Sequence, residues 1–185
     1  MRTFIAIELG DQVIKALEDM IGSLRKLGGH VKWVKPHNLH LTMKFLGEVS
    51  ADQIPPIQTT IQMAAAGQPE FTFTVRGTGT FPSGSRSPKV LWVGIESQPA
   101  LLLLQQELES ELQKLGFPQE KRPFSPHLTI GRVRNSRDLN PVLTALESRS
   151  DSDFGTVPAD RLILFKSTLK PAGAEYTSLF EAGMP

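Results

Sequence analysis

Two periods of apolar and polar residues run along this chain, and together they predict a mixture of strands and helices. Alternation with a period of two, or a short apolar run, is typical of a strand. Apolar residues three and four positions apart indicate a helix that buries one face. Strand patterns occupy residues 3–9, 31–34, 39–46, 71–81, 90–95, 127–133, 161–169 and 175–180. Helical patterns occupy residues 11–27, 53–66, 99–115 and 139–146.

Residues at the ends of these segments support the assignment. Asp11 is placed to cap the first helix, and Ser50 and Gln53 have the spacing of a capping box before the second. Gly77 and Gly79 interrupt the alternation of residues 71–81, which indicates a bulge or a close approach of another group to the backbone. No strand or helix is predicted between residue 146 and the strand at 161.

Strands with interspersed helices, arranged in two similar halves, favour an α+β fold class. A chain of 185 residues is long enough for one domain or for two small lobes that share a core. We therefore treat residues 1–185 as a single domain of two related lobes.

One short motif occurs twice, about half a chain apart. It reads His40-Leu41-Thr42-Met43 in the first half and His127-Leu128-Thr129-Ile130 in the second. Each copy lies in a predicted strand and follows a turn marked by proline. A single His-x-Thr has little meaning, but two copies in matching context are a specific pattern. They are the only internal repeat that the sequence shows, one in each expected lobe.

Strand geometry gives the repeat a physical meaning. Side chains at i and i+2 share one face of a strand, so His40 lies beside Thr42, and His127 beside Thr129. Imidazole titrates close to neutral pH and can give or take a proton. Two imidazoles that meet across one phosphate suit an in-line displacement, with hydroxyl donors beside them for the non-bridging oxygens. This chemistry requires no metal ion or other cofactor.

Composition excludes several classes of protein and of binding site. Hydrophobic residues at 39% and charged residues at 21% are ordinary globular values, and the formal net charge of +1 excludes a strongly basic nucleic-acid binder. The chain has no cysteine, which rules out disulfides and thiolate metal sites. Neither a signal peptide nor a membrane-spanning run is apparent. We expect a cytoplasmic, monomeric protein that has no contact with a membrane.

The paired motifs resemble the 2H phosphoesterase superfamily, and within it the RNA 2′,3′-cyclic phosphodiesterases, also called 2′-5′ RNA ligases. The likeness extends over nearly the whole chain and is clearest at residues 2–7, 35–48, 126–132 and 167–176. It implies a bilobal fold in which two antiparallel sheets, related by a pseudo-twofold axis, line a central cleft with helices outside. It also implies a partner, an RNA with a 2′,3′-cyclic phosphate end or a related cyclic nucleotide.

The resemblance also implies roles for the motif residues. His127 would activate water for attack on the cyclic phosphate, and His40 would protonate the departing 3′ oxygen to leave a 2′-phosphomonoester. Thr42 and Thr129 would bind the phosphate oxygens. The near-identical motifs themselves do not decide which imidazole is the acid.

The fifth residue after each motif histidine is a further candidate for substrate binding. Phe45 could stack on a base, and Arg132 could pair with phosphate. Regular strand alternation places both on the opposite face from the histidines, so only a bulge or the end of the strand would turn them inward. Other cations in or near the motif strands could line an RNA path, namely Lys44, Lys121, Arg122 and Arg134.

Several features have simpler explanations. Trp33 and Trp92 lie in apolar strands and are expected in the core. Lys121 and Arg122 are most simply part of a solvated loop, which could also form a lid. A metal site from the histidines at 30, 37 and 40 is conceivable, but no carboxylate cluster supports it.

Three functions remain open from the sequence. The first is metal-independent hydrolysis of RNA 2′,3′-cyclic phosphate ends. The second is reversible ligation or cleavage of 2′-5′ linkages, which is the same chemistry in the other direction. The third is a non-catalytic module that binds RNA or nucleotides, although both motif histidines are intact.

Overall fold

The computed structural model describes residues 1–96 and 98–185 and contains two antiparallel sheets. The first, which we call sheet A, has the strand order β3-β1-β8-β9 and includes both ends of the chain. Its strands are β1 (Arg2–Glu8), β3 (His40–Glu48), β8 (Arg161–Lys170) and β9 (Gly173–Gly183). The second, sheet B, has the order β2-β6-β5-β4-β7. Its strands are β2 (His30–Trp33), β4 (Phe71–Phe81), β5 (Val90–Ile95), β6 (His127–Asn135) and β7 (Asp153–Ala159).

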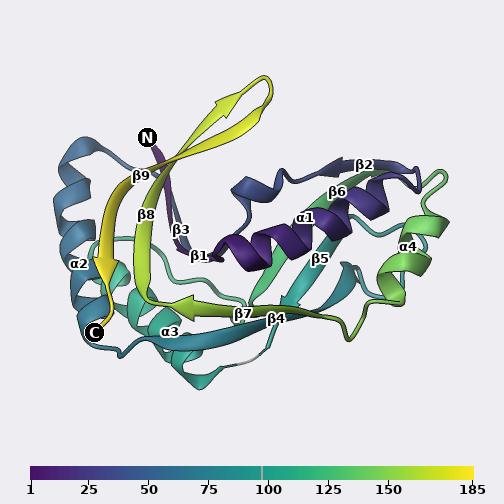
Figure 1. Cartoon of the computed structure of the whole chain (residues 1–185). Coiled ribbons are helices and arrows are strands. Elements are labelled where there is room, and N and C mark those ends of the chain that lie inside the picture. The colour runs from purple at the N-terminus through teal and green to yellow at the C-terminus, as the bar shows by residue number, and fades with distance from the viewer. Residues whose placement is uncertain (97) are drawn as a thin grey trace.

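Each sheet has its own pair of helices. Helices α2 (Ile54–Ala66) and α3 (Pro99–Lys114) pack together beside sheet A, where α2 contacts β8 and β9 and α3 contacts β3. Helices α1 (Asp11–Arg25) and α4 (Asn140–Glu147) contact each other and the strands of sheet B. Figure 1 shows the two halves side by side, with the β8–β9 hairpin standing out from sheet A. The α+β fold class with two antiparallel sheets is therefore confirmed.

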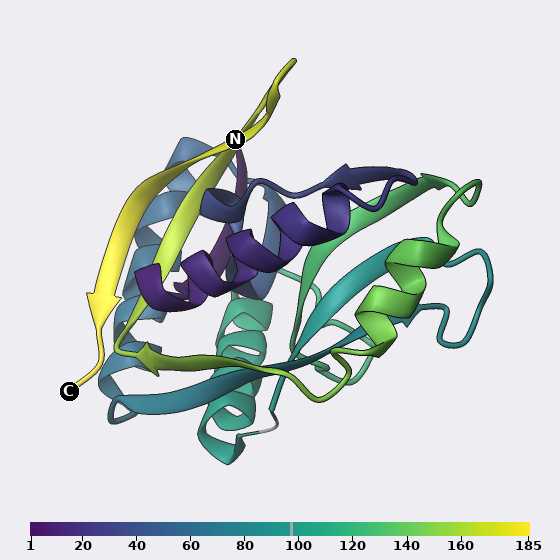
Figure 2. The same cartoon turned by 45° about the vertical axis from the view of Figure 1, so that its right-hand side comes forward.

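The two sheets correspond strand for strand. The order β3-β1-β8-β9 of sheet A parallels β6-β5-β4-β7 of sheet B, and β2 is an additional edge strand. In this correspondence the two motif strands, β3 and β6, take equivalent places. The chain passes repeatedly from one sheet to the other, as Figure 2 shows, so neither half is a continuous segment.

Buried apolar side chains on the helix-facing sides of both sheets form one continuous core. Ile5 and Ile7 of β1 and Leu41 of β3 are almost completely buried in it, as are Leu91 and Val93 of β5. This one-sided burial leaves the other face of each sheet for polar and aromatic residues, among them the motif histidines and threonines.

Strand β7 is the element that the sequence pattern did not predict. It contains Gly155 and Pro158, two residues that are unfavourable in strands, and pairs only with β4 at the edge of sheet B. An edge strand tolerates a proline because one row of its backbone groups needs no partner. Elsewhere the predicted segments are confirmed to within a few residues.

The two glycines of β4 confirm the expected irregularity. The register between β4 and β5 shifts beside Gly77, whose φ is +79°. Gly79 lies under the ring of Trp92, because a Cβ there would meet the indole at 2.1 Å. In the part of the chain that the structure describes, no helix has the length and apolarity needed to cross a bilayer.

Candidate active site

Both motif strands carry a bulge at the same position. Along β3, Lys44 pairs with Ile5 and Thr42 pairs with Ala6, so Met43 is an extra residue. Along β6, Gly131 pairs with Leu91 and Thr129 pairs with Trp92, so Ile130 is the extra residue. Each bulge follows the motif threonine directly and reverses the alternation of side chains beyond it.

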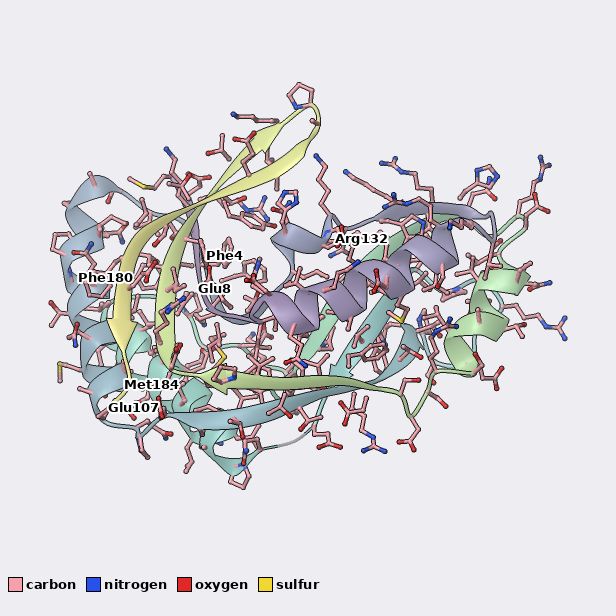
Figure 3. The ribbon with its side chains drawn as sticks, viewed as in Figure 1. Phe4, Glu8, Glu107, Arg132, Phe180 and Met184 are labelled. Atoms are coloured by element: carbon pink, nitrogen blue, oxygen red, sulfur yellow. The ribbon has the colours of Figure 1, made fainter. Side chains whose placement is uncertain are left out.

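The bulges bring the fifth residue after each histidine to the histidine face. Phe45 pairs with Phe4, and its ring lies 5.9 Å from the Phe4 ring, which also stacks on His40. Arg132 takes the corresponding place on β6 and is exposed, as Phe45 is. Each motif strand therefore has the bulge that is needed to turn its fifth residue toward the histidine face. Figure 3 labels Arg132 in sheet B and Phe4 in sheet A.

His40 is enclosed by aromatic rings from three strands of sheet A. Its ring stacks on Phe4 with centroids 4.7 Å apart, and Tyr176 of β9 contacts it edge-on at 5.0 Å. Phe165 of β8 lies 5.9 Å away. This burial lowers the pKa of His40 from its ordinary value to about 4, although the Asn38 carbonyl and Glu8 both act in the opposite direction.

Asn38 connects His40 to the β8–β9 hairpin. Its backbone carbonyl is a hydrogen-bond partner of the His40 ring, and its side-chain Nδ2 donates to the carbonyl of Ala174 at 2.9 Å. Ala174 is two residues from Tyr176, so one residue orients the imidazole and also holds the strand that covers it.

His127 has a different environment. It is exposed, and its Nδ1 lies 2.8 Å from the carbonyl of Ser125. A carbonyl can only accept, so Nδ1 carries the proton and Nε2 is free for a substrate. Ser125 precedes His127 by two residues, as Asn38 precedes His40, so both imidazoles are oriented by the same backbone device.

Trp92 lies on the site face of sheet B and not in the core, which corrects the expectation. It pairs with Thr129, and cross-strand partners share a face. Its ring rests on Gly79, which leaves it half-buried, whereas its neighbours Leu91 and Val93 fill the core. Trp33, by contrast, packs against the core as expected.

Lys44 does not line an RNA path. The bulge turns it toward α3, where it is 8% exposed and paired with Glu109 at 2.7 Å. The other candidate cations, Lys121, Arg122 and Arg134, are exposed. Among the described residues no three histidine or carboxylate groups lie close enough to hold a metal ion, so the histidines at 30, 37 and 40 do not converge.

The sequence matches a known family and several named relatives. A model of the 2′-5′ RNA ligase superfamily matches residues 13–170. The chain belongs to this superfamily. An RNA 2′,3′-cyclic phosphodiesterase of Thermotoga maritima is 40% identical over 183 residues, covering 98% of this chain and 94% of that protein. Another, from Archaeoglobus fulgidus, is 34% identical over 97% of this chain and 98% of its own length.

Solved structures of similar proteins share the fold of this superfamily member. TT0787 of Thermus thermophilus superposes with a TM-score of 0.83 at 30% identity, covering 100% of this chain and 98% of that one. LigT of E. coli, in its complex with 3′-AMP, gives a TM-score of 0.74 at 27% identity over 99% and 97% of the two chains. The family resemblance expected from the paired motifs is thus confirmed.

Among the residues that touch or orient the motif, Asn38, Phe4 and Tyr176 were not singled out as site residues from the sequence. All lie in segments that carry the family resemblance, but their contacts with His40 depend on strand pairing between residues far apart in the chain. No local pattern reveals such pairing. Asn38, two residues before a motif histidine, is the one whose position gave a usable signal.

Proposed function

We propose that this superfamily member hydrolyses RNA 2′,3′-cyclic phosphate ends to 2′-phosphomonoesters, with residues 40 and 127 as the catalytic imidazoles. The family and the names of its relatives support a cyclic phosphodiesterase. The finer assignment rests on one observation, that β3 and β6 belong to different sheets and still approach each other. Each strand brings a histidine, a threonine and an i+5 side chain to its site face. We infer that the whole chain acts as one catalytic domain with one motif per half.

In this mechanism His127 is the base. Its free Nε2 removes a proton from water as the water oxygen attacks phosphorus. His40 then donates a proton to the departing 3′ oxygen, which leaves the phosphate on the 2′ oxygen. The hydroxyls of Thr42 and Thr129 donate to the non-bridging oxygens as negative charge moves onto them. Both proton transfers are assigned to imidazoles, so no step needs a metal ion.

The low pKa of His40 makes the donor role depend on the substrate. With a pKa of about 4, only about one His40 in a thousand carries the proton at pH 7 in the free protein. A phosphodiester anion placed beside the ring favours the charged form and raises its pKa. The aromatic enclosure thus keeps His40 neutral until the phosphate arrives, and His40 then takes up a proton from the solvent and serves as the acid.

Phe45 and Arg132 are proposed as substrate contacts on either side of the phosphate. Phe45 offers an exposed ring for a nucleobase. The Arg132 guanidinium can form a bidentate pair with a phosphate oxygen pair. Equivalent bulges place both side chains on the histidine faces of their strands, where one is aromatic and the other is cationic.

The proposal is tested with a short RNA that ends in a 2′,3′-cyclic phosphate, incubated with the protein in EDTA, followed by identification of the product isomer. Formation of a 2′-phosphate supports the proposed reaction and its direction of cleavage. A 3′-phosphate would reverse which oxygen leaves, and turnover lost in EDTA would indicate a metal enzyme. Binding with no turnover would favour a non-catalytic module, and joining of two RNAs through a 2′-5′ linkage would favour ligation.

A further inference from the structure

The face of β3 opposite His40 carries a buried ion pair. Lys44 Nζ lies 2.7 Å from Glu109 Oε2 of α3, and the two side chains are 7% and 11% exposed. Lys44 comes just after the first motif, in the bulge that also sets the position of Phe45. The pair therefore joins a motif strand to the helix behind it.

Both charged groups also bind the backbone of the segment that leads to the second motif. This segment comprises residues 115–126 and joins α3 to β6. Lys44 Nζ donates to the carbonyl of Pro118 at 2.6 Å, and the amide of Glu120 donates to Glu109 Oε2 at 3.1 Å. The other carboxylate oxygen of Glu109 accepts from Gln105 Nε2 at 3.1 Å. The pair thus fastens residues 118–120 to β3 and α3.

Little else holds the middle of this segment. Residues 118–123 are exposed, and a hollow of about 430 Å³ separates the segment from α3. Prolines at 118, 123 and 126 restrict the backbone between the ion pair and His127. Fixing residues 118–120 therefore limits the path of the segment up to Phe124, which packs against the core, and Ser125, the hydrogen-bond partner of the imidazole. The backbone of His127 is held by its pairing with Gly94 of β5.

An ion pair in this position needs a reason other than stability. Burying two charges costs about as much free energy as their attraction returns, and apolar side chains of similar size are often as stable. What the pair adds is defined geometry, since each charged group makes directional bonds to the segment.

We propose that Lys44 and Glu109 are positioning residues that hold the segment leading to Ser125 and thereby set the orientation of the His127 ring toward His40. This proposal rests on the proposed function, because it gives the ion pair a role in aligning the two imidazoles. In this proposal the two motifs are connected through the ion pair, which lies on the face of β3 that is turned away from the site.

The test is the double variant Lys44→Met/Glu109→Leu, which removes both charges together and leaves no uncompensated charge. The matched control is Lys114→Met/Glu111→Leu, which removes a more exposed ion pair on the same helix, with side chains 66% and 34% exposed. Unfolding by urea shows whether each variant is folded. Turnover of the cyclic phosphate RNA and the NMR resonances of the His127 ring are then measured on all three proteins.

We expect the double variant to fold, to lose about 10- to 100-fold in kcat with KM within about twofold, and to show a shifted or broadened His127 resonance. The control should keep kcat within about twofold. A folded double variant with wild-type kcat and an unchanged His127 resonance would overturn the proposal. If the double variant does not fold, the single variant Glu109→Gln is measured in its place. A kcat lower by about threefold or more then supports the proposal, and an unchanged kcat overturns the proposal.

These results separate the two proposals. Failure of the wild-type protein to turn over any cyclic phosphate RNA would refute the proposed function. The His127 resonance would still show whether the ion pair positions the ring, because that measurement needs no substrate.

Discussion

The two motif strands carry the same His-Leu-Thr sequence in the same bulged geometry, yet their histidines lie in opposite environments. His40 is enclosed by Phe4, Phe165 and Tyr176, and this burial lowers its pKa to about 4. His127 is exposed, and its Nδ1 lies beside the backbone carbonyl of Ser125. Pseudo-symmetry thus supplies two equivalent positions, and the surrounding aromatic residues make the two imidazoles chemically different.

A general acid must carry its proton when the leaving oxygen departs, and the enclosure alone favours the neutral form of His40. The donor role therefore requires that the bound phosphate raise the pKa of His40. We interpret the aromatic enclosure as the feature that makes protonation of His40 depend on the substrate.

The largest expected effect comes from removing either imidazole. His40→Ala and His127→Ala should each lower turnover of the cyclic phosphate RNA by at least about 10²–10⁴-fold, since each loses a proton transfer. Stability should distinguish the two variants. His40→Ala removes a packed ring and should lower the free energy of unfolding by about 2 kcal/mol, whereas His127→Ala should leave it unchanged. Near wild-type turnover in either variant would contradict the assigned roles.

The threonines should matter next. Thr42→Val and Thr129→Val remove a hydroxyl with little change of shape, and each should reduce kcat by about 10²-fold, as expected for loss of one donor to a developing negative charge. Thr→Ser at the same positions should retain most of the activity. Equal rates in the Val and Ser variants would show that the hydroxyls do not contact the phosphate in the transition state.

Acid should destabilise the fold through His40. The unfolded chain binds a proton at His40 below about pH 6.5, whereas the folded protein binds it only near pH 4. This contribution to stability is therefore complete above pH 6.5 and is lost as the pH falls to 4, by at most ~3 kcal/mol. Urea unfolding of wild type and His40→Asn across this range measures it, and parallel curves would refute the burial effect.

The smallest effects are expected at the two i+5 residues. Arg132→Ala and Phe45→Ala should raise KM for RNA by about 10-fold while kcat changes less, because they remove a phosphate pair and a stacked base respectively. Arg132→Lys should recover only part of the loss, since the bidentate geometry is missing. If Phe45→Leu behaves like wild type, the ring does not stack on a base.

Much of this arrangement could be read from the sequence. The two copies of the motif identified the strands, the candidate residues and the family, since they depend on local pattern. The bulges after Thr42 and Thr129 could not be predicted, because a bulge is defined by pairing with a distant strand. They decided the orientation of Phe45, Arg132 and Lys44.

The environment of each histidine could not be predicted from the sequence either. Three strands of sheet A bring Phe4, Phe165 and Tyr176 around His40, and only the tertiary structure joins them. Trp92 shows the same limit, since its apolar strand indicated the core and its register places it on the site face. Local pattern predicted the candidate residues, and tertiary contacts give the two similar motifs different environments.

The central claim is tested most directly by NMR titration of the His40 ring, free and bound to adenosine 2′-monophosphate, with the ring assigned by His40→Asn. The account predicts a pKa of about 4 in the free protein and a rise of more than about one unit in the complex. A free-state pKa near 6.5, or no rise on binding, would contradict the proposed dependence of His40 protonation on the substrate.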